Sequence, residues 1–309
     1  MAALINDTSG TLIASAYTDQ AVKIGVIFGT GYNAAYMEDC GSIPKLKHLN
    51  LPPDMPMVIN CEYGAFDNEH LVLPRTPYDV MIDESSPRPG QQCFEKMIAG
   101  LYLGEIFRLV LLDLHDNKQL IFQPQSQPDQ QRPDLSKLRQ PYSLDSSFLS
   151  QVESDPFENL SETRDLFESK LHLHATKPEC ELAHRLAELI NTRAARLSAC
   201  GIAAICKKKG IEACHVGADG SVFTKSPHFK ERGALALREI LGWDGPDTKS
   251  GEVAHRGKKK EDPVVLNASE DGSGVGAALI AALTIRRVKQ GIVAGIRDPT
   301  NFEKCPHVA

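Results

Sequence analysis

Short runs of apolar residues recur along the chain and predict the strands of a sheet. A continuous apolar run of about four to eight residues is typical of a buried strand. Such runs occupy residues 22–29, 33–39, 57–62, 213–217 and 264–268. The first two flank Gly29-Thr30-Gly31, so we expect a hairpin at that turn. Leu4 and Ile5 are expected to end a further strand, directly before Asn6.

Other segments carry apolar residues at the three- and four-residue spacing of a helix face, and they predict helices. These segments are residues 91–113, 146–153, 161–170, 179–209, 227–241 and 272–290, with a short helix expected near 45–49. The apolar stripe predicted for 179–209 consists of Leu182, Leu186, Leu189, Ile190, Leu197, Ile202 and Ile205. Gly201 should interrupt this helix and Gly210 should end it. Residues 9–18 favour a strand by propensity alone.

Two segments lack both patterns and predict loops. Residues 117–134 are rich in glutamine and proline, so we expect a solvated loop that buries nothing. Residues 246–262 include a basic run from Arg256 to Lys260. In an acidic protein this run is typical of a solvated insertion and not of a nucleic-acid site.

Composition and charge exclude several classes of protein. The chain has 309 residues, enough for two ordinary domains or one large one, and its net charge of −6 predicts neither a nucleic-acid nor an anionic-membrane partner. It has no apolar run of about 18 residues and no basic, then apolar, secretory leader. None of its eight cysteines forms Cys-x-x-Cys, which indicates free thiols in a reducing compartment. We therefore predict a cytoplasmic location.

Candidate chemistry lies where apolar runs end. Asp7 and Glu62 are carboxylates at such ends, and Asp7 has a natural position for a general base. The Gly29–Gly31 turn could direct backbone N–H groups at a phosphate. Each motif also has a plain structural interpretation: residues 6–8 as a turn or helix cap, and the glycine turn as only a turn. The histidines at 172, 174, 184 and 215 have no spacing that completes a metal site.

The order of several motifs narrows these alternatives. Asn-Asp-Thr at 6–8 is followed by FGTGYN, NCEYGAF, SPRPGQQCFEKM, GADGSVF and EDGSGVGAAL. This series resembles the hexokinase family, most closely the fungal-type hexokinases, over nearly the whole chain. The resemblance implies an α/β fold of the actin-like ATPase (ribonuclease H-like) class, with a mixed sheet flanked by helices. It assigns residues 1–309 to the large, C-terminal domain and favours a helix over 9–18.

The resemblance also implies a hexose site. It assigns Asp7 as the general base that accepts the proton of the sugar 6-hydroxyl. Asn6, Asn33, Glu62 and Glu95, together with Asp7, match the family's sugar-binding positions. Amide and carboxylate groups suit a polyol, because they can pair hydroxyls that would otherwise be buried without partners. From its spacing alone, Glu95 has the pattern of a surface residue on a helix.

A nucleotide site is implied by three glycine-rich segments. The matching positions are Gly29, Thr30 and Gly31; Gly217, Asp219, Gly220 and Ser221; and Gly272, Ser273, Gly274 and Gly276. The first matches the family's second phosphate segment and the second its adenosine segment, while the third opens a helix whose N-terminus favours an anion. The implied substrates are glucose or another hexose and ATP, which brings Mg²⁺ with it.

The chain departs from the family at its start. The N-terminal half of a hexokinase, with its first phosphate loop and the Thr-Lys pair of the small domain, is not found in this sequence. Three interpretations follow: a truncated hexokinase of weak or no activity, a non-catalytic sugar-sensing or interaction protein derived from a hexokinase, and an incomplete gene model. The intact enzyme of the family would transfer the γ-phosphoryl group of Mg²⁺–ATP to the 6-hydroxyl of the hexose.

Overall fold

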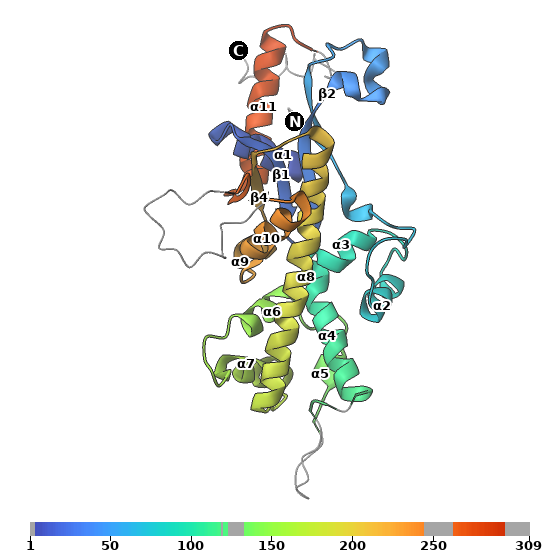
Figure 1. Ribbon diagram of the computed structural model, residues 1–309, viewed down its shortest axis with the longest axis vertical. Coiled ribbons are helices and arrows are strands. Elements are labelled where there is room, and N and C mark those ends of the chain that lie inside the picture. The colour runs from blue at the N-terminus through green and yellow to red at the C-terminus, as the bar shows by residue number, and fades with distance from the viewer. Residues whose placement is uncertain (1–3, 119, 123–132, 244–261, 294–309) are drawn as a thin grey trace, which may run out of the picture.

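The computed structural model describes residues 4–118, 120–122, 133–243 and 262–293. They form an elongated molecule with a sheet toward one end and a group of helices at the other (Figure 1). The longest helix, α8 (Lys177–Lys209), runs past the sheet and into the helical end. The part of the chain that carries the candidate motifs lies around the sheet.

Within the described residues, five strands form one mixed sheet. They are β1 (Val22–Phe28), β2 (Tyr32–Asp39), β3 (Pro56–Asn60), β4 (Cys214–Asp219) and β5 (Val264–Ala268), in the order β3-β2-β1-β4-β5. Strands β1, β2 and β3 pair antiparallel, whereas β4 pairs parallel with both β1 and β5. The five predicted strands and the hairpin at the glycine turn are confirmed. In this topology the carboxyl ends of β1, β3, β4 and β5 lie beside the start of β2. We call this end of the strands the sheet edge.

Helix α1 (Asp7–Thr18) occupies the segment for which propensity and resemblance disagreed, and the resemblance was right. The strand predicted to end at Leu4 and Ile5 is wrong: these residues are not in a strand, and the Leu4 side chain is 88% exposed. Asn6 caps the helix, accepting a hydrogen bond from the Thr8 backbone N–H at 2.9 Å. Residues 6–8 are therefore a helix start.

Helix α1 covers the sheet and packs against α11 (Gly272–Lys289), which follows β5. A Cβ atom on Gly276 would lie 2.0 Å from the backbone oxygen of Gly10, so the two helices touch backbone to backbone. Likewise, a Cβ on Gly25 in β1 would lie 2.6 Å from the backbone of Leu12. Small residues thus set how closely α1 approaches both its neighbours.

The remaining helices build the other end of the molecule and the outer layer. They are α2 (Pro77–Ser85), α3 (Cys93–Ile98), α4 (Gly100–Asp116), α5 (Ser136–Arg139), α6 (Ser146–Glu153), α7 (Ser161–Leu166), α9 (Ser221–Lys225) and α10 (Phe229–Leu241). Short 3₁₀ turns occur at Cys40–Ser42, Pro44–Leu49 and Tyr63–Ala65, and a π turn at Phe167–Leu171. The helices predicted over 146–153, 161–170, 227–241 and 272–290 are confirmed to within a few residues, whereas α2, α5 and α9 were not predicted. The other two predicted helices differ as described next.

The helix predicted over 91–113 is divided in two at Ala99. The backbone N–H of Gly100 donates to the carbonyl of Gly29 at 2.8 Å, and that of Leu101 donates to Thr30 at 3.3 Å. A side chain at Gly100 would collide with the Gly29 carbonyl and with Val222. The start of α4 therefore anchors the glycine turn between β1 and β2, a contact that helical spacing along the chain does not reveal.

The buried face of helix α8 differs from the predicted one. Gly201 does not interrupt it, although Gly210 ends it with a φ of +63° as expected. Its buried positions are mostly small: Cys180, Ala183, Ala187, Ala194, Ala195, Ser198, Ala199 and Ala203, with Ile190, Asn191, Ile202, Ile205 and Cys206. The predicted stripe was partly wrong, because Leu189 is half exposed. Small residues allow α8 to lie close to its neighbours.

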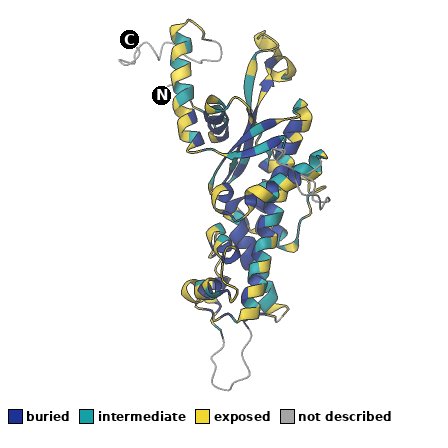
Figure 2. Cartoon of the chain, turned by 60° about the vertical axis from the view of Figure 1, so that its left-hand side comes forward, coloured by how far each residue is buried: buried dark blue, intermediate teal, exposed yellow. Residues whose placement is uncertain are grey.

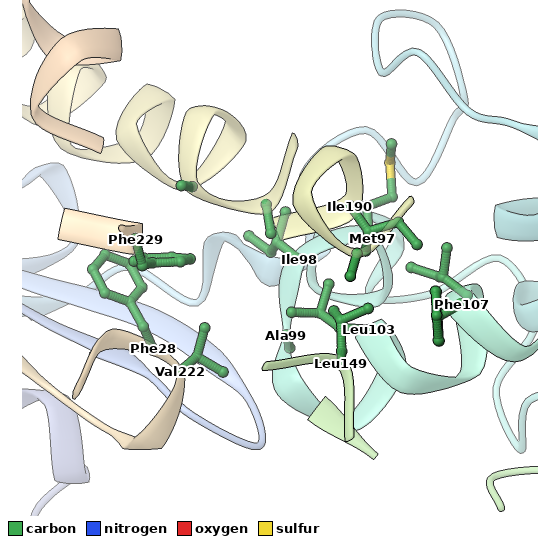
Figure 3. Close-up of a cluster of buried hydrophobic side chains, with 14 of the residues drawn as sticks. Phe28, Met97, Ile98, Ala99, Leu103, Phe107, Leu149, Ile190, Val222 and Phe229 are labelled. Carbon is green, nitrogen blue, oxygen red and sulfur yellow. The ribbon is translucent and has the colours of Figure 1, made fainter. Parts of the chain in front are cut away.

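The core is continuous from the sheet to the helical end, as the buried residues in Figure 2 show. In Figure 3, Phe28 of β1 contacts the side of α9 and α10 at Val222 and Phe229, and the cluster continues through Ile98 to Leu149. Ile121 and Phe122 belong to this core, so the prediction that residues 117–134 bury nothing was wrong. The Phe122 ring packs against that of Phe167 in a tilted arrangement, with ring centres 5.6 Å apart. The predicted basic loop lies outside the described residues, except Asp262.

Candidate functional site

The predicted sugar-binding residues lie at the sheet edge where β3 ends and β2 begins. Continuing the antiparallel register of these strands by two residues places Asn33 opposite Glu62. The Nδ2 atom of Asn33 donates to Glu62 Oε1 at 3.2 Å, and the Glu62 backbone N–H donates back to Asn33 Oδ1 at 2.9 Å. Asn6 Nδ2 lies 3.5 Å from the same Oε1 atom and links the start of α1 to the pair.

Asn60 joins this group and was not among the predicted residues. Its Nδ2 donates to Glu62 Oε1 at 2.9 Å, and its Oδ1 accepts from Asn33 Nδ2 at 2.6 Å. A signal was present in the sequence, since residues two apart in a strand face the same way and Asn60 precedes Glu62 by two. Three asparagine amides thus converge on one carboxylate oxygen.

Glu62 has an unusual backbone, with a φ of +50°. A non-glycine residue in this left-handed region carries strain of about 1–3 kcal/mol and is held there by its surroundings. The bonds to Asn33 supply that restraint. Next to it, burial and the nearby Glu62 charge raise the pKa of Cys61 to about 11, so this thiol stays neutral.

Glu95 reaches the same edge from α3. Its Oε2 accepts a hydrogen bond from the Tyr32 backbone N–H at 2.9 Å. A Cβ on Gly31 would lie 3.1 Å from this oxygen, and a Cβ on Gly64 would lie 3.0 Å from the Glu95 Cβ. The two glycines leave room for the carboxylate. Glu95 is half-buried in this contact, which argues against its being an ordinary surface residue.

Asp7 is the first residue of α1 and is exposed. Its Oδ1 accepts a hydrogen bond from the Thr8 backbone N–H at 2.8 Å. The side chain is thereby held against the first turn of α1. The contact of the adjacent Asn6 with Glu62 places Asp7 beside the group of asparagines and glutamates.

Two of the glycine-rich segments meet at the neighbouring part of the edge. A Cβ on Gly29 would lie 3.7 Å from the Cα of Gly220, so the β1–β2 turn touches the turn that follows β4. Thr30 and Ser221 are exposed there. Asp219 connects the third segment, because its carboxylate accepts from the N–H groups of Gly220 at 2.6 Å and Gly272 at 3.1 Å.

Other predicted nucleotide-binding residues lie in packing contacts. Gly217 is buried inside β4, where a Cβ would lie 2.1 Å from the Ser15 hydroxyl of α1. Gly276 is buried against Gly10. Ser273 is half-buried beside Gly10, and Gly274 is exposed with the Asp271 carboxylate close by. The structure therefore brings Gly29, Thr30, Gly220, Ser221 and Gly272 together, and leaves Gly217 and Gly276 behind the edge.

The residue after Glu62 fastens this edge to α8. Tyr63 donates a hydrogen bond to the Tyr32 hydroxyl at 3.0 Å, and Tyr32 donates to the Ser198 carbonyl at 2.6 Å. Gly201 makes room for the Tyr63 ring, because a Cβ there would lie 2.6 Å from it. An apolar cavity of about 630 Å³ opens beside the Tyr63 ring, between β3 and α8. Gly201 is explained by this contact and not by a break in the helix.

We expect Gly201→Val to lower the stability of the protein and its affinity for glucose. The added methyl groups would push the Tyr63 ring and, through it, Glu62, and such overpacking typically costs about 1–3 kcal/mol of stability. Thermal unfolding and glucose titration should both show the change. Ala204→Val is the matched control, because Ala204 lines the open cavity. Equal behaviour of the two variants would contradict this role of Gly201.

A separate group of possible metal ligands lies near α3. His70, Asp83 and Cys93 bring one ligand atom each to within 4.8 Å of one another. However, Asp83 already accepts hydrogen bonds from Lys96 Nζ at 2.6 Å and from Arg75 at 3.4 Å. The positive charges beside Asp83 oppose a cation, so we assign this group to packing.

Among the described helices, none is both long and apolar enough to cross a membrane.

Comparison with known proteins shows the family of the chain. A family model described as hexokinase matches residues 23–283. The chain belongs to the hexokinase family. It is 67% identical over 299 residues to the hexokinase of Emericella nidulans and 54% identical over 297 residues to hexokinase-1 of Saccharomyces cerevisiae. These matches cover 96% and 95% of this chain but 57% of each relative, so the chain spans little more than half the length of a fungal hexokinase.

Solved hexokinases confirm the fold. The hexokinase of Schistosoma mansoni, solved in complex with glucose, superposes with a TM-score of 0.73 at 33% identity, over 91% of this chain and 57% of that one. A second hexokinase structure gives 0.68 at 28% identity over 91% of this chain and 55% of its own. The predicted actin-like ATPase class, with its mixed sheet and flanking helices, is therefore confirmed for the part of a hexokinase that this chain spans.

Proposed function

We propose that this chain provides the sugar-binding and nucleotide-binding edge of a hexokinase. The protein would transfer the γ-phosphoryl group of Mg²⁺–ATP to the 6-hydroxyl of glucose or another hexose. The observation that carries the proposal is the convergence of Asn6, Asn33 and Glu62 beside Asp7, at the sheet edge that also holds the glycine turns. Ligands of open α/β sheets bind at the carboxyl ends of the strands, where this edge lies.

The residues of the edge have different tasks in this proposal. Glu62 and Glu95 would accept from sugar hydroxyls, and Asn33 would donate to one by giving up its longer contact, the 3.2 Å bond to Glu62 Oε1. Asp7, exposed at the start of α1, would take the proton of the 6-hydroxyl as the bond to phosphorus forms. Water would compete with the sugar as acceptor, and closure of a second lobe over this edge would exclude it.

The nucleotide would lie along Gly29, Thr30, Gly220 and Ser221. Two exposed hydroxyls and closely spaced glycines suit a phosphate chain, because glycine allows an anion to approach the backbone. The N-terminus of α11 is a less suitable site for the phosphate chain. The Asp219 carboxylate already accepts the Gly272 N–H and brings a negative charge there. Gly217 and Gly276 would act by setting how α1 packs. ATP supplies the phosphoryl group and carries Mg²⁺ with it.

A glucose titration tests the proposal. We define the completed form as this chain joined to the part of the Emericella nidulans hexokinase that it does not span. Calorimetry should detect binding of D-glucose but not of L-glucose to this form. Asn33→Ala should weaken binding about tenfold or more, because it removes hydrogen bonds to a charged group. Absence of D-glucose binding would refute the proposed function.

The matched control is Asn117→Ala. Asn117 also donates to a carboxylate, Asp113 Oδ1 at 2.7 Å, but it lies on the surface at the end of α4. Its removal should leave glucose affinity unchanged. The alternative of a non-catalytic sugar-sensing protein predicts the same binding, and the two are separated by the turnover measurements in the Discussion.

A further inference from the structure

Asn60 uses both ends of its side-chain amide within the protein. It is the last residue of β3 and lies two residues before Glu62. Its Nδ2 donates to Glu62 Oε1 at 2.9 Å, and its Oδ1 accepts from Asn33 Nδ2 at 2.6 Å. The Asn60 amide therefore connects two residues that we assign to the sugar, and its own oxygen is already engaged.

The orientation of these amides follows from backbone donors. Asn33 Oδ1 accepts from the N–H groups of Glu62 at 2.9 Å and of Ala34 at 2.8 Å, so this atom must be the oxygen. The amino group of Asn33 then faces Asn60 and Glu62. Asn60 must present its oxygen to that amino group, which turns its own amino group toward the Glu62 carboxylate. The donor and acceptor of each hydrogen bond among Asn33, Asn60 and Glu62 are thus determined.

Three side-chain donors of the described residues reach the same carboxylate oxygen of Glu62. Asn33, Asn60 and Asn6 approach Oε1 at 3.2, 2.9 and 3.5 Å. The last torsion of a glutamate side chain is broad, so a carboxylate held at one oxygen is far more ordered than a free one. With Oε1 engaged by the protein, Oε2 is the oxygen presented to a ligand.

We propose that Asn60 is a positioning residue for hexose binding, which fixes the Glu62 carboxylate without touching the sugar. This inference rests on the proposed function, because it assumes that Glu62 binds sugar hydroxyls. In this proposal, Asn60 affects glucose affinity only by orienting the Glu62 carboxylate. Substitutions at the two positions should therefore not be additive, as expected for residues that share one hydrogen-bond network.

A double-mutant cycle tests the inference. The glucose affinity of the completed form is measured by calorimetry for Asn60→Ala, Glu62→Gln and the double variant. We expect Asn60→Ala to weaken binding about tenfold, which corresponds to one hydrogen bond to a charged group. In the Glu62→Gln background, Asn60→Ala should add little. In a kinetic assay, Asn60→Ala should raise KM with kcat largely unchanged.

Asn60→Asp separates positioning from a merely structural role. Aspartate keeps the shape of asparagine but sets a second carboxylate against Glu62 Oε1, so it should weaken glucose binding more than alanine does. A side chain that only fills space would tolerate aspartate. Thermal unfolding shows whether each variant is folded, and Asn117→Ala again serves as the control for removal of an exposed amide.

The outcomes separate the two proposals. If the unsubstituted completed form binds no glucose, the proposed function fails and the role of Asn60 fails with it. If it binds glucose and Asn60→Ala binds equally well, only the role of Asn60 is refuted. The same holds if Asn60→Ala has its full effect in the Glu62→Gln background, because Asn60 would then act independently of Glu62.

Discussion

Asp7→Asn in the completed form is expected to lower kcat by about 10²–10⁴-fold, the usual contribution of a general base. Asparagine keeps the size of the side chain and can still accept the hydrogen bond from the Thr8 backbone N–H, but it cannot accept the proton of the sugar 6-hydroxyl at neutral pH. Glucose affinity should change little, because Asn33, Glu62 and Glu95 would still pair the other hydroxyls. A coupled assay for ADP release gives kcat, and calorimetry gives the affinity.

The control for this substitution is Asp165→Asn, since Asp165 is an exposed aspartate of α7 in the other part of the molecule. It should turn over glucose at the unsubstituted rate. Normal kcat for Asp7→Asn would show that another group takes the proton. If Asp7→Asn loses glucose binding as well as turnover, the main role of Asp7 would instead be to bind the sugar.

The chain of 309 residues by itself should turn over glucose at least about 10²–10³-fold more slowly than the completed form, which is the cost of removing even one preorganised donor to a transition-state oxyanion. It spans 57% of the fungal relatives. The family resemblance assigns the first phosphate loop and the second sugar-binding lobe to the part that it does not span. Phosphoryl transfer depends on positioning and electrostatics, so both losses act directly on the rate.

The comparison requires that both forms are folded, which circular dichroism and thermal unfolding show. Turnover by the chain alone within about tenfold of the completed form, a difference of about 1.4 kcal/mol in the barrier, would mean that the edge described above is sufficient for catalysis. If the completed form binds glucose but also lacks turnover, the non-catalytic, sugar-sensing interpretation gains support.

Several features of the fold were predictable because they depend on local pattern. The five strands follow from short apolar runs, and the end of α8 at Gly210 follows from the preference of a left-handed position for glycine. Residues 9–18 show the limit of this reasoning. Their β-branched and small residues favour a strand by propensity, yet they form α1, because Asn6 caps the helix and α11 packs against its glycine face.

The misassigned elements share a cause. Helix spacing through 91–113 does not show that the Gly29 and Thr30 carbonyls occupy the first N–H groups of α4. The alanines of α8 have too little apolar surface to mark a face, but close neighbours make them its buried side. Ile121 and Phe122 lie beside a glutamine-rich segment, and only the helices around them make them part of the core.

The sequence by itself determined the family, the order of the strands along the chain and most residues of the candidate site, because these depend on motifs of consecutive residues. The tertiary structure decided which of those residues meet. It placed Asn60 with Asn33 and Glu62 across two strands, gave Asp219 the N–H of Gly272, and set Gly217 and Gly276 into helix packing. These outcomes depend on strand register and on the distance between helices, which residues far apart in the sequence establish only when the chain has folded.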